Sequence, residues 1–173
     1  MLARVRSGET AAYAELVTRH APMARRLAVL SGAGADADDV VQEAFVKAYR
    51  SLSSFRDGAD FRPWLLRIVV NETRNLHRGR SRRVDRELRV AREGAPLVGD
   101  RDPAEVAVGH ERHETLLDAI GRLPTELRDV VTCRYLLELS ETETAGALCI
   151  PHGTVKSRLH RGLARLREEL PHG

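Results

Sequence analysis

The clearest candidate for binding chemistry is a run of polar and basic residues near the end of the chain. Val155, Leu159, Leu163, Leu166 and Leu170 recur at the spacing that places them on one side of a helix. The other faces then carry these hydrogen-bonding side chains: Thr154, Lys156, Ser157, Arg158, His160 and Arg161. An α-helix fits the major groove of DNA, where Arg and Lys bind guanine or phosphate. The pattern therefore indicates recognition of DNA by hydrogen bonds.

The segment before this helix favours DNA recognition over a simple solvated surface. An isolated basic helix is more often a charged face exposed to water. Here Ser140 is suited to cap a short helix ending near Cys149, and the basic helix follows after Ile150. Short helix, tight turn and basic helix predict a helix-turn-helix, with the small residue Ala145 where the two helices cross.

A second candidate segment, a predicted helix, lies at residues 61–78. It begins with apolar residues and ends with polar and basic ones, among them Asn71. An asparagine side chain both donates and accepts hydrogen bonds, so Asn71 is suited to reading a base. Nearby arginines are suited to the phosphate backbone, with solubility as the alternative role: Arg74, Arg78, Arg80, Arg82 and Arg83.

The elements that position these segments are predicted to be helices, which makes the fold class all-α. Apolar residues recur with helical period, and no segment shows the sustained alternation of a half-buried strand. Besides 61–78, the predicted helices span 10–19, 22–30, a stripe over 41–52, 103–122, 123–136, 140–149 and a terminal helix from about 151. Residues 79–103 hold glycines, two prolines and few large apolar groups, which is typical of a tether. We expect two small helical domains, 1–83 and 104–173, joined by a flexible linker at 84–103.

Composition and charge limit the possible functions. The 173 residues are 42% hydrophobic and 31% charged, with a formal net charge of +3, as in ordinary folded domains. Acids gather at 36–60 and arginines at 67–92, which suggests two different partners. Cys133 and Cys149 form no Cys-x-x-Cys pattern, so neither a disulfide framework nor a zinc site is indicated. Without a signal peptide or a membrane-spanning run, the protein is expected in the cytoplasm, with no membrane insertion.

Three strings in the chain resemble successive signatures of one bacterial family, the extracytoplasmic-function (ECF) sigma factors of the sigma-70 family. They are DDVVQEAFVKAY at 38–49, FRPWLLRIVVN at 61–71 and LSETETAGALCIPHGTVKSRLHR at 139–161, in the family order and spacing. The resemblance implies two helical domains, region 2 and region 4, that bind core RNA polymerase and recognise promoter DNA. An anti-sigma factor is a further implied partner.

The resemblance also implies a polymerase-binding site on the third helix. Asp39, Val40, Gln42 and Glu43 match the residues that in the family dock on the clamp helices of the polymerase β′ subunit. Two other interpretations are a helical first turn that favours carboxylates and a metal site at Asp39 and Glu43. The metal site is disfavoured because neither a histidine nor a second acid-bearing helix supports it, so no metal is expected.

For the minus-ten promoter element, the resemblance implies a set on the predicted helix at 61–78: Phe61, Arg62, Trp64, Asn71, Arg74 and Arg78. In the family this segment opens the duplex and holds an unpaired base, so both double- and single-stranded DNA are implied partners. Unstacking a base costs a few kcal/mol, of which stacking can return about 1–3 kcal/mol. Phe61 and Trp64 are nevertheless expected to be core residues first, touching DNA at most by an edge.

For the minus-thirty-five element, the resemblance implies the polar set Thr154, Lys156, Ser157, Arg158, His160 and Arg161. Two departures from the family pattern and one glycine within the helix predict a less rigid region 4. Cys149 stands in the turn where the family usually has Gly, and Thr144 where a buried Ile or Val is common. Gly162 costs about 1 kcal/mol in a helix relative to Ala. Cys149 is expected to be a small, partly buried thiol rather than a redox sensor.

Three classes of function remain to be compared: a promoter-specificity factor for polymerase, a stand-alone helix-turn-helix regulator, and an enzyme acting on nucleic acid. The enzyme lacks a metal cluster, a nucleophile with its base and a phosphate-binding Gly loop, so no enzymatic activity, cofactor or small-molecule substrate is expected. His110 and His113 are more simply a solvated helix face than a metal pair. The stand-alone regulator does not account for residues 36–78. The sequence therefore favours the specificity factor.

Overall fold

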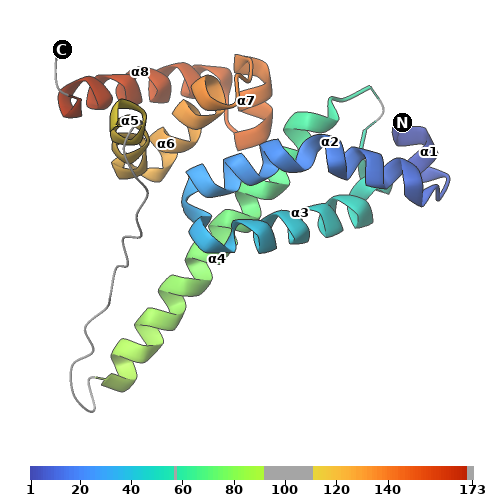
Figure 1. Cartoon of the computed structure of the whole chain (residues 1–173), viewed down its shortest axis with the longest axis horizontal. Coiled ribbons are helices and arrows are strands. Elements are labelled where there is room, and N and C mark those ends of the chain that lie inside the picture. Colours follow the sequence, from blue (N-terminus) through green and yellow to red (C-terminus); the bar gives the residue numbers. More distant parts are fainter. Residues whose placement is uncertain (57, 92–110, 171–173) are drawn as a thin grey trace.

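The computed structural model describes the backbone of residues 1–56, 58–91 and 111–170, and the side chains of 1–56, 58–82 and 116–170. Every regular element within these ranges is helical, which confirms the all-α class. The main helices are α1 (Leu2–Arg6), α2 (Thr10–Ala28), α3 (Ala37–Ser51), α4 (Phe61–Ala91), α5 (Glu111–Arg122), α6 (Thr125–Val131), α7 (Glu141–Leu148) and α8 (His152–Glu169) (Figure 1). We call α1–α4 the N-terminal bundle and α5–α8 the C-terminal bundle.

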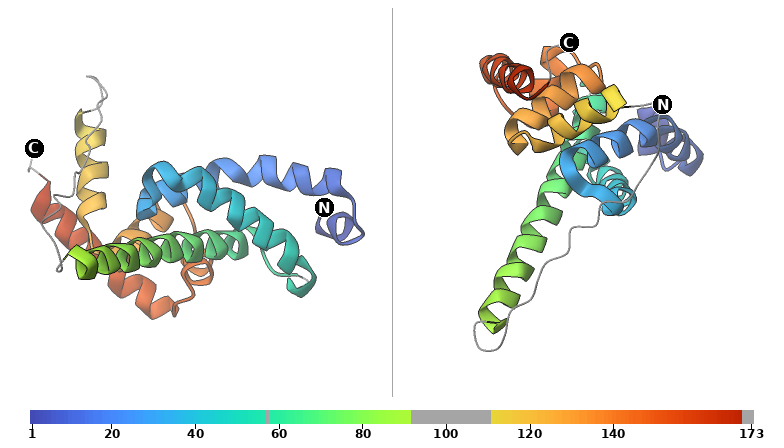
Figure 2. Two further views of the ribbon diagram at one scale, coloured as in Figure 1. Left: turned by 90° about the horizontal axis from the view of Figure 1, so that it is seen from below. Right: turned by 60° about the vertical axis from the view of Figure 1, so that its left-hand side comes forward.

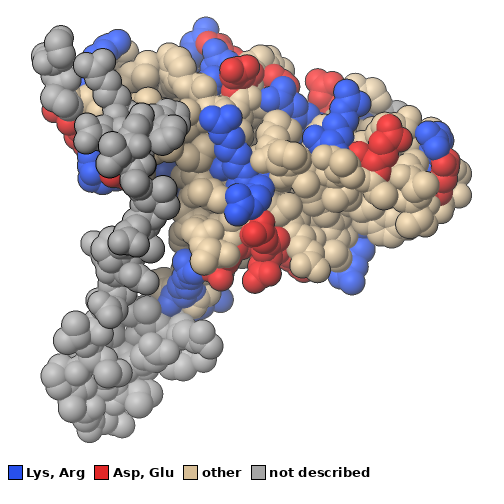
Figure 3. All heavy atoms as spheres, viewed as in Figure 1, with Lys and Arg blue, Asp and Glu red and all other residues tan. Residues whose placement is uncertain are grey.

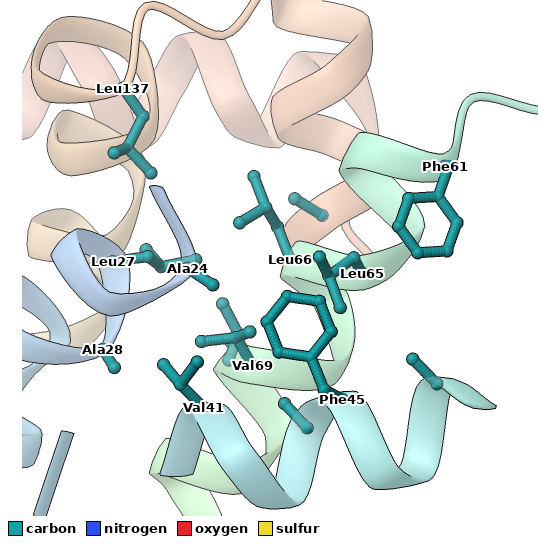
Figure 4. Packing of buried hydrophobic residues seen from close by; sticks show 14 of the residues in the cluster. Ala24, Leu27, Ala28, Val41, Phe45, Phe61, Leu65, Leu66, Val69 and Leu137 are labelled. Carbon is teal, nitrogen blue, oxygen red and sulfur yellow. The ribbon is translucent and has the colours of Figure 1, made fainter. Parts of the chain in front are cut away.

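The N-terminal bundle is built around the apolar first half of α4. Leu65 and Val69 of α4 face Phe45 of α3, and Leu27 approaches the same core from α2 (Figure 4). Leu27, Leu65 and Val69 are fully buried. Each such side chain contributes about 1.5–3 kcal/mol when it leaves water, so this core fixes the relative positions of the three helices.

The second helix differs from the sequence-based prediction. Residues 10–19 and 22–30 were expected to form two helices, but α2 runs without interruption from Thr10 to Ala28 with Pro22 inside it. An interior proline removes one backbone hydrogen bond and usually breaks the helix. Leu16, Ala24 and Leu27 lie on one buried face across that position, so burial of this face outweighs the local cost.

The fourth helix is also longer than predicted. It was expected to end near Arg78 but continues to Ala91, so the backbone of 84–91 is helical where a linker was predicted. Residues 80–91 contain no proline or glycine and are rich in Arg, Glu and Leu, which favour helix. This second half of α4 projects beyond the two bundles (Figure 2). The rest of the predicted linker, and residues 103–110 of the next predicted helix, lie outside the described residues.

In the C-terminal bundle α8 packs closely on α6 because of a glycine. A Cβ atom at Gly162 would lie 2.8 Å from Cγ2 of the buried Val131, closer than side-chain carbons normally approach. The absence of a side chain therefore allows α8 to lie against α6. The prediction that Gly162 loosens this region considered helix propensity alone and missed this packing role.

The two bundles are in contact, which the sequence did not predict. Helix α7 lies against α4, and one apolar cluster contains residues of both bundles. In Figure 4 Leu66 of α4 points toward the C-terminal bundle, and Leu137 of that bundle points toward α2. The fold therefore consists of two helical bundles that share part of one core.

Candidate DNA and polymerase interfaces

Helix α8 is held so that its polar face is directed away from the bundle. It begins after Pro151, whose extended conformation ends the turn from α7. Val155, Gly162 and Leu166 are buried. Lys156, Ser157, His160 and Arg161 are exposed, and Thr154 is half-buried. Five of the six residues implied for the minus-thirty-five element are thus available at the surface.

Arg158, the sixth member of that set, is half-buried and engaged with another helix of the C-terminal bundle. Its Nη2 atom lies 2.8 Å from Oε2 of Glu126 on α6, and only 19% of its side chain is exposed. Lys156 is 3.6 Å from Glu141 of α7 but stays largely exposed. Arg161 makes no ion pair with the described residues, so its guanidinium group is free to bind a base or a phosphate.

The helix before the turn is fixed by a capping box at Ser140, the residue that the sequence suggested as its cap. The Glu143 amide donates to Oγ of Ser140 at 3.1 Å, and the Ser140 amide donates to Oε2 of Glu143 at 2.8 Å. These bonds satisfy amides that the first turn of a helix otherwise leaves unpaired. The bond from the Ser140 amide also holds the pKa of Glu143 below its ordinary value.

Cys149 occupies the turn in a left-handed conformation, with φ of 55°. Glycine adopts this conformation without strain, which gives a physical reason for a glycine at this position of the motif. The Cys149 side chain is exposed, so the prediction that it is partly buried is wrong.

Thr144 is fully buried, and its Oγ1 finds no hydrogen-bond partner among the described residues. The second free cysteine, Cys133, is buried, which raises the pKa of its thiol to about 12.

The aromatic residues implied for the minus-ten element belong to a packed cluster. Phe61 is buried, and Trp64 is half-buried. The Phe61 ring centroid lies 5.6 Å from that of Trp64 and 5.3 Å from that of His20, while Phe55 lies 4.9 Å from Trp64. Such tilted and edge-on arrangements stabilise a core. As expected, both residues are structural, and only Trp64 presents part of its surface.

Asn71 and Arg78 occupy the solvent-exposed face of α4. Arg67, Asn71, Asn75 and Arg78 are all exposed and follow one another at three- and four-residue intervals, so they form one polar stripe. Asn71 makes no hydrogen bond with the described residues, whereas Asn75 donates to Glu72 at 3.4 Å. Asn71 and Arg78 are therefore the members of the minus-ten set whose polar side chains the structure leaves exposed.

Arg62 and Arg74 instead face the C-terminal bundle. Arg62 donates to the Leu137 carbonyl at 2.7 Å and lies 3.5 Å from Glu143. Arg74 pairs with Asp129 at 3.1 Å. Burial raises the pKa of the Asp129 carboxyl, although Arg74 acts in the opposite direction. Residues that the resemblance assigned to DNA are therefore engaged within the chain.

Helix α3 presents an acidic surface at its first two turns. Asp39, Gln42 and Glu43 are exposed, whereas Val40 is buried in the core. Glu43 lies 3.4 Å from Lys47, which also donates to Glu72 at 2.6 Å. Of the four residues implied for polymerase, three offer side chains to a partner, and Val40 fixes the helix that carries them.

An apolar groove runs between α2 and α3 beside the acidic residues. It has a volume of about 700 Å³. Its lining includes Tyr13, Val17, Val41, Phe45, Val46 and Tyr49. Val46 and Tyr49 are exposed, and uncharged (tan) surface extends over α2 and α3 in Figure 3. Tyr13 packs on Tyr49 with ring centroids 4.8 Å apart, and burial raises the pKa of Tyr13 to about 12.

The groove was not predicted from the sequence, although the sequence contains a signal for it. Val46 and Tyr49 follow Gln42 at four- and three-residue intervals, so they share the face of the acidic residues rather than the buried stripe. Large apolar residues on such a face mark a binding surface more often than a solvated one.

The described residues also bear on the alternative sites. No group of three His, Cys, Asp or Glu side chains within them could hold a metal ion, which includes the site considered at Asp39 and Glu43. His110 and the side chain of His113 lie outside the described part. No helix described here has both the length and the apolar character needed to cross a membrane.

Comparison with family models shows the class of protein to which the chain belongs. Residues 16–83 match the family model of sigma-70 region 2, and residues 113–166 match that of sigma-70 region 4. The two matches fall on the N-terminal and C-terminal bundles in that order. The chain thus has the two-part organisation of sigma-70 transcription initiation factors.

Relatives along the whole chain define the family within that class. The ECF RNA polymerase sigma-E factor of Escherichia coli K12 is 36% identical over 167 residues, which cover 93% of this chain and 87% of the relative. The sigma-E factor of Haemophilus influenzae is 32% identical over 176 residues, covering 98% and 93%. This chain belongs to the ECF RNA polymerase sigma factors. It is an alternative sigma factor that directs transcription initiation, and such factors are not enzymes.

Solved structures agree with this assignment. CnrH, in its complex with the cytosolic domain of CnrY, superposes with a TM-score of 0.70 at 30% identity, covering 96% of this chain and 92% of CnrH. The sigma factor RpoE of Bartonella quintana, in complex with the anti-sigma factor NepR, has a TM-score of 0.66 at 23% identity, covering 90% and 94%. Both likenesses support the fold.

Proposed function

We propose that this sigma factor binds core RNA polymerase through α3 and contacts two promoter elements through α4 and α8. The observation that carries the proposal is that each of the three helices leaves polar side chains exposed at the positions implied by the family motifs. The protein acts in the cytoplasm, where RNA polymerase is found. Its two functional domains are residues 1–83, which include α1–α3 and most of α4, and residues 104–173, which include α5–α8.

The polymerase-binding surface combines charge with an apolar groove. Asp39, Gln42 and Glu43 supply negative charge and hydrogen-bond acceptors, and Val46 and Tyr49 supply apolar area directly beside them. This combination fits an amphipathic helical partner with basic residues at its edge, because apolar burial gives affinity and charge gives orientation. The β′ clamp helices are the partner that the family implies.

The minus-ten element is contacted by the exposed stripe of α4, with Asn71 as the base-reading residue. Arg78 belongs to the same stripe, and its guanidinium group is suited to binding phosphate. Phe61 supports the cluster from within, and the exposed edge of Trp64 is available to an unpaired base. Arg62 and Arg74 join this surface when their contacts with the C-terminal bundle are released.

The minus-thirty-five element is contacted by α8 in the major groove. Arg161 reads a base from the centre of the polar face. Lys156 and Ser157 bind phosphate, and their position permits close approach of the helix to DNA. Thr154 and His160 flank them, and Arg158 steadies the helix through Glu126. The complex of Bartonella quintana RpoE with the anti-sigma factor NepR supports an anti-sigma factor as a further partner of this chain.

The proposed function is tested by run-off transcription with purified core polymerase and a library of promoter fragments. A sigma factor gives promoter-specific transcripts with core alone, whereas a stand-alone regulator gives none until another sigma factor is added. Asp39→Lys combined with Glu43→Lys is expected to abolish co-elution with core and, with it, the transcript. Glu15→Lys combined with Glu168→Lys changes the charge equally at two other exposed positions and should keep both. Undiminished co-elution of the α3 double variant would contradict the assignment of α3.

A further inference from the structure

The exposed face of α3 beside the apolar groove separates its charges by sign along its length. Asp39 lies in the first turn of the helix, and Arg50 lies in its last turn. Both side chains are exposed, and neither makes an ion pair with the described residues. At about 1.5 Å per residue the two positions lie about 16 Å apart along the helix axis. The face is therefore negative at one end and positive at the other.

The surface between these two charges is apolar and partly open to water. Val46 is 36% exposed and Tyr49 is 49% exposed. Tyr13 and Val17 of α2 line the other side of the groove and are half-buried. Apolar area of this kind is removed from water only when a partner covers it, and its burial then favours association.

This order of charge, apolar surface and opposite charge is complementary to itself. A twofold axis that crosses α3 midway between Asp39 and Arg50 turns the helix end for end. Each Asp39 then faces Arg50 of the second copy, so the interface contains this pair twice. The two residues share one side of α3, because the interval between them is close to three full turns.

The charges also exclude the other simple arrangement of two copies. An axis parallel to α3 would bring the acidic end of one copy against the acidic end of the other. Like charges placed opposite each other in an interface disfavour association. The charge pattern therefore selects antiparallel α3 helices, with the apolar centre of each face covering that of the other.

The size of the face limits the strength of such a contact. Helices α2 and α3 contain 19 and 15 residues, which correspond to lengths of about 28 and 22 Å. Two helices side by side are about 20 Å wide, so the face covers roughly 500 Å² per copy. A standard stable interface buries about 800 Å² per partner. The contact is thus expected to be reversible, with a dissociation constant in the micromolar range.

We propose that a second copy of this chain docks on the α2–α3 face and forms a weak symmetric dimer, through Val46, Tyr49 and two Asp39–Arg50 pairs. The dimer covers the groove that the proposed function gives to polymerase. Copies in excess of polymerase are then stored as dimers, and the monomer binds polymerase. This competition rests on the proposed function, whereas the dimer itself does not.

Exchange of the two charges tests the dimer and its symmetry. Arg50→Asp places an acid opposite Asp39 at both ends, and Asp39→Arg places a base opposite Arg50 at both ends. In sedimentation equilibrium on the full chain, each variant alone should raise the dissociation constant by at least about tenfold. An equimolar mixture of the two variants forms a heterodimer in which both pairs are opposite in sign again. Its dissociation constant should return to within about threefold of that of the unchanged chain.

Arg19→Asp serves as the matched control. Arg19 is exposed two residues from Val17, on the opposite side of α2 from the groove, so this variant should dimerise like the unchanged chain. An unchanged chain that stays monomeric at all concentrations up to about a millimolar would overturn the proposal. So would a mixture that associates no more tightly than either variant alone. Misfolding cannot imitate the expected result, because the same two variant proteins regain association on mixing.

Addition of core polymerase to the preformed dimer tests the competition separately. The dimer should dissociate and give a complex that contains one copy of the chain per polymerase. A complex that retains two copies would count against the assignment of this face to polymerase, which belongs to the proposed function. The exchange of charges would still decide whether the dimer exists.

Discussion

The two bundles differ in how much of their stability comes from a core formed by their own residues. The N-terminal bundle closes around large side chains of α2, α3 and α4, including Leu27, Leu65 and Val69, which are fully buried. Among the side chains that the structure describes, the separate core of the C-terminal bundle consists of six buried residues: Ala119, Ile120, Leu123, Leu127, Val131 and Leu166. Its other buried residues, such as Val130 and Leu148, belong to a cluster shared with the N-terminal bundle. The C-terminal bundle therefore depends on the N-terminal bundle for part of its stability.

The largest effect is expected from Leu65→Ala in the N-terminal core. Truncation of a fully buried leucine costs about 2–5 kcal/mol of unfolding free energy through lost burial and a residual cavity. If the C-terminal bundle depends on this core, Trp64 fluorescence and far-ultraviolet circular dichroism should show one common unfolding transition at lower denaturant. Val29→Ala, at an exposed position, should change stability by no more than about 0.5 kcal/mol. If only the fluorescence transition were lost and the circular dichroism transition remained, the two bundles would unfold independently.

Gly162→Ala should weaken the C-terminal bundle by about 1–2 kcal/mol. The added Cβ meets Val131 at 2.8 Å, and a buried β-branched side chain in a helix has little freedom to move. This cost exceeds the gain of up to about 1 kcal/mol that alanine brings to a helix. Gly121→Ala in α5 has open space around it and should be neutral or stabilising. Thermal unfolding of both variants measures the difference, and a stabilised Gly162→Ala protein would refute the packing role.

Thr144→Val should stabilise the same bundle by about 1 kcal/mol. The Thr144 hydroxyl is buried without a partner among the described residues, and a methyl group of the same size removes that desolvation cost. Denaturant unfolding of the variant measures the gain. A destabilised variant would mean that the hydroxyl is hydrogen-bonded, by a water molecule for example, and that α7 is better satisfied than the contacts indicate.

The smallest effect concerns the pH dependence of the capping box. The folded state lowers the pKa of Glu143, so its contribution to stability is present above the ordinary value of 4.5 and is lost as the pH falls through the lowered value. Glu143→Gln should therefore flatten the acid limb of the stability profile of the C-terminal bundle. Gln can still accept a hydrogen bond from the Ser140 amide, so stability near pH 7 should fall only slightly. An acid limb identical to that of the unchanged chain would contradict this assignment.

Local features were predictable from the sequence because short-range chemistry determines them. The helical period, the Ser140 cap and the polar face of α8 all depend on residues within a few positions of one another. In contrast, Pro22 remains inside α2 because of burial against other helices. The pairing of Arg74 with Asp129 joins residues 55 positions apart. No periodicity signals such a pairing, so the contact between the bundles could be found only in the structure.

The candidate site also combines features that nearby residues determine with features that depend on distant ones. Motif spacing indicated α3, α4 and α8 as the functional helices, but it did not separate Asp39 and Glu43, which are exposed, from Val40, which is buried. Likewise it could not show that Arg158 pairs with Glu126 while Arg161 remains free of ion pairs with the described residues. Exposure and pairing of individual side chains depend on neighbours distant in the sequence.

The division of labour between the two bundles is tested most directly by probing the complete initiation complex for unpaired bases and for upstream protection in the same experiment. Asn71→Ala is expected to keep nuclease protection of the upstream element but to lose permanganate reactivity at the minus-ten element. Arg161→Ala is expected to weaken upstream protection by about 1–3 kcal/mol of binding free energy, while the complexes that form still contain unpaired bases. If both variants lost the same signal, or if neither lost any, the two bundles would not read separate elements and the account would be wrong.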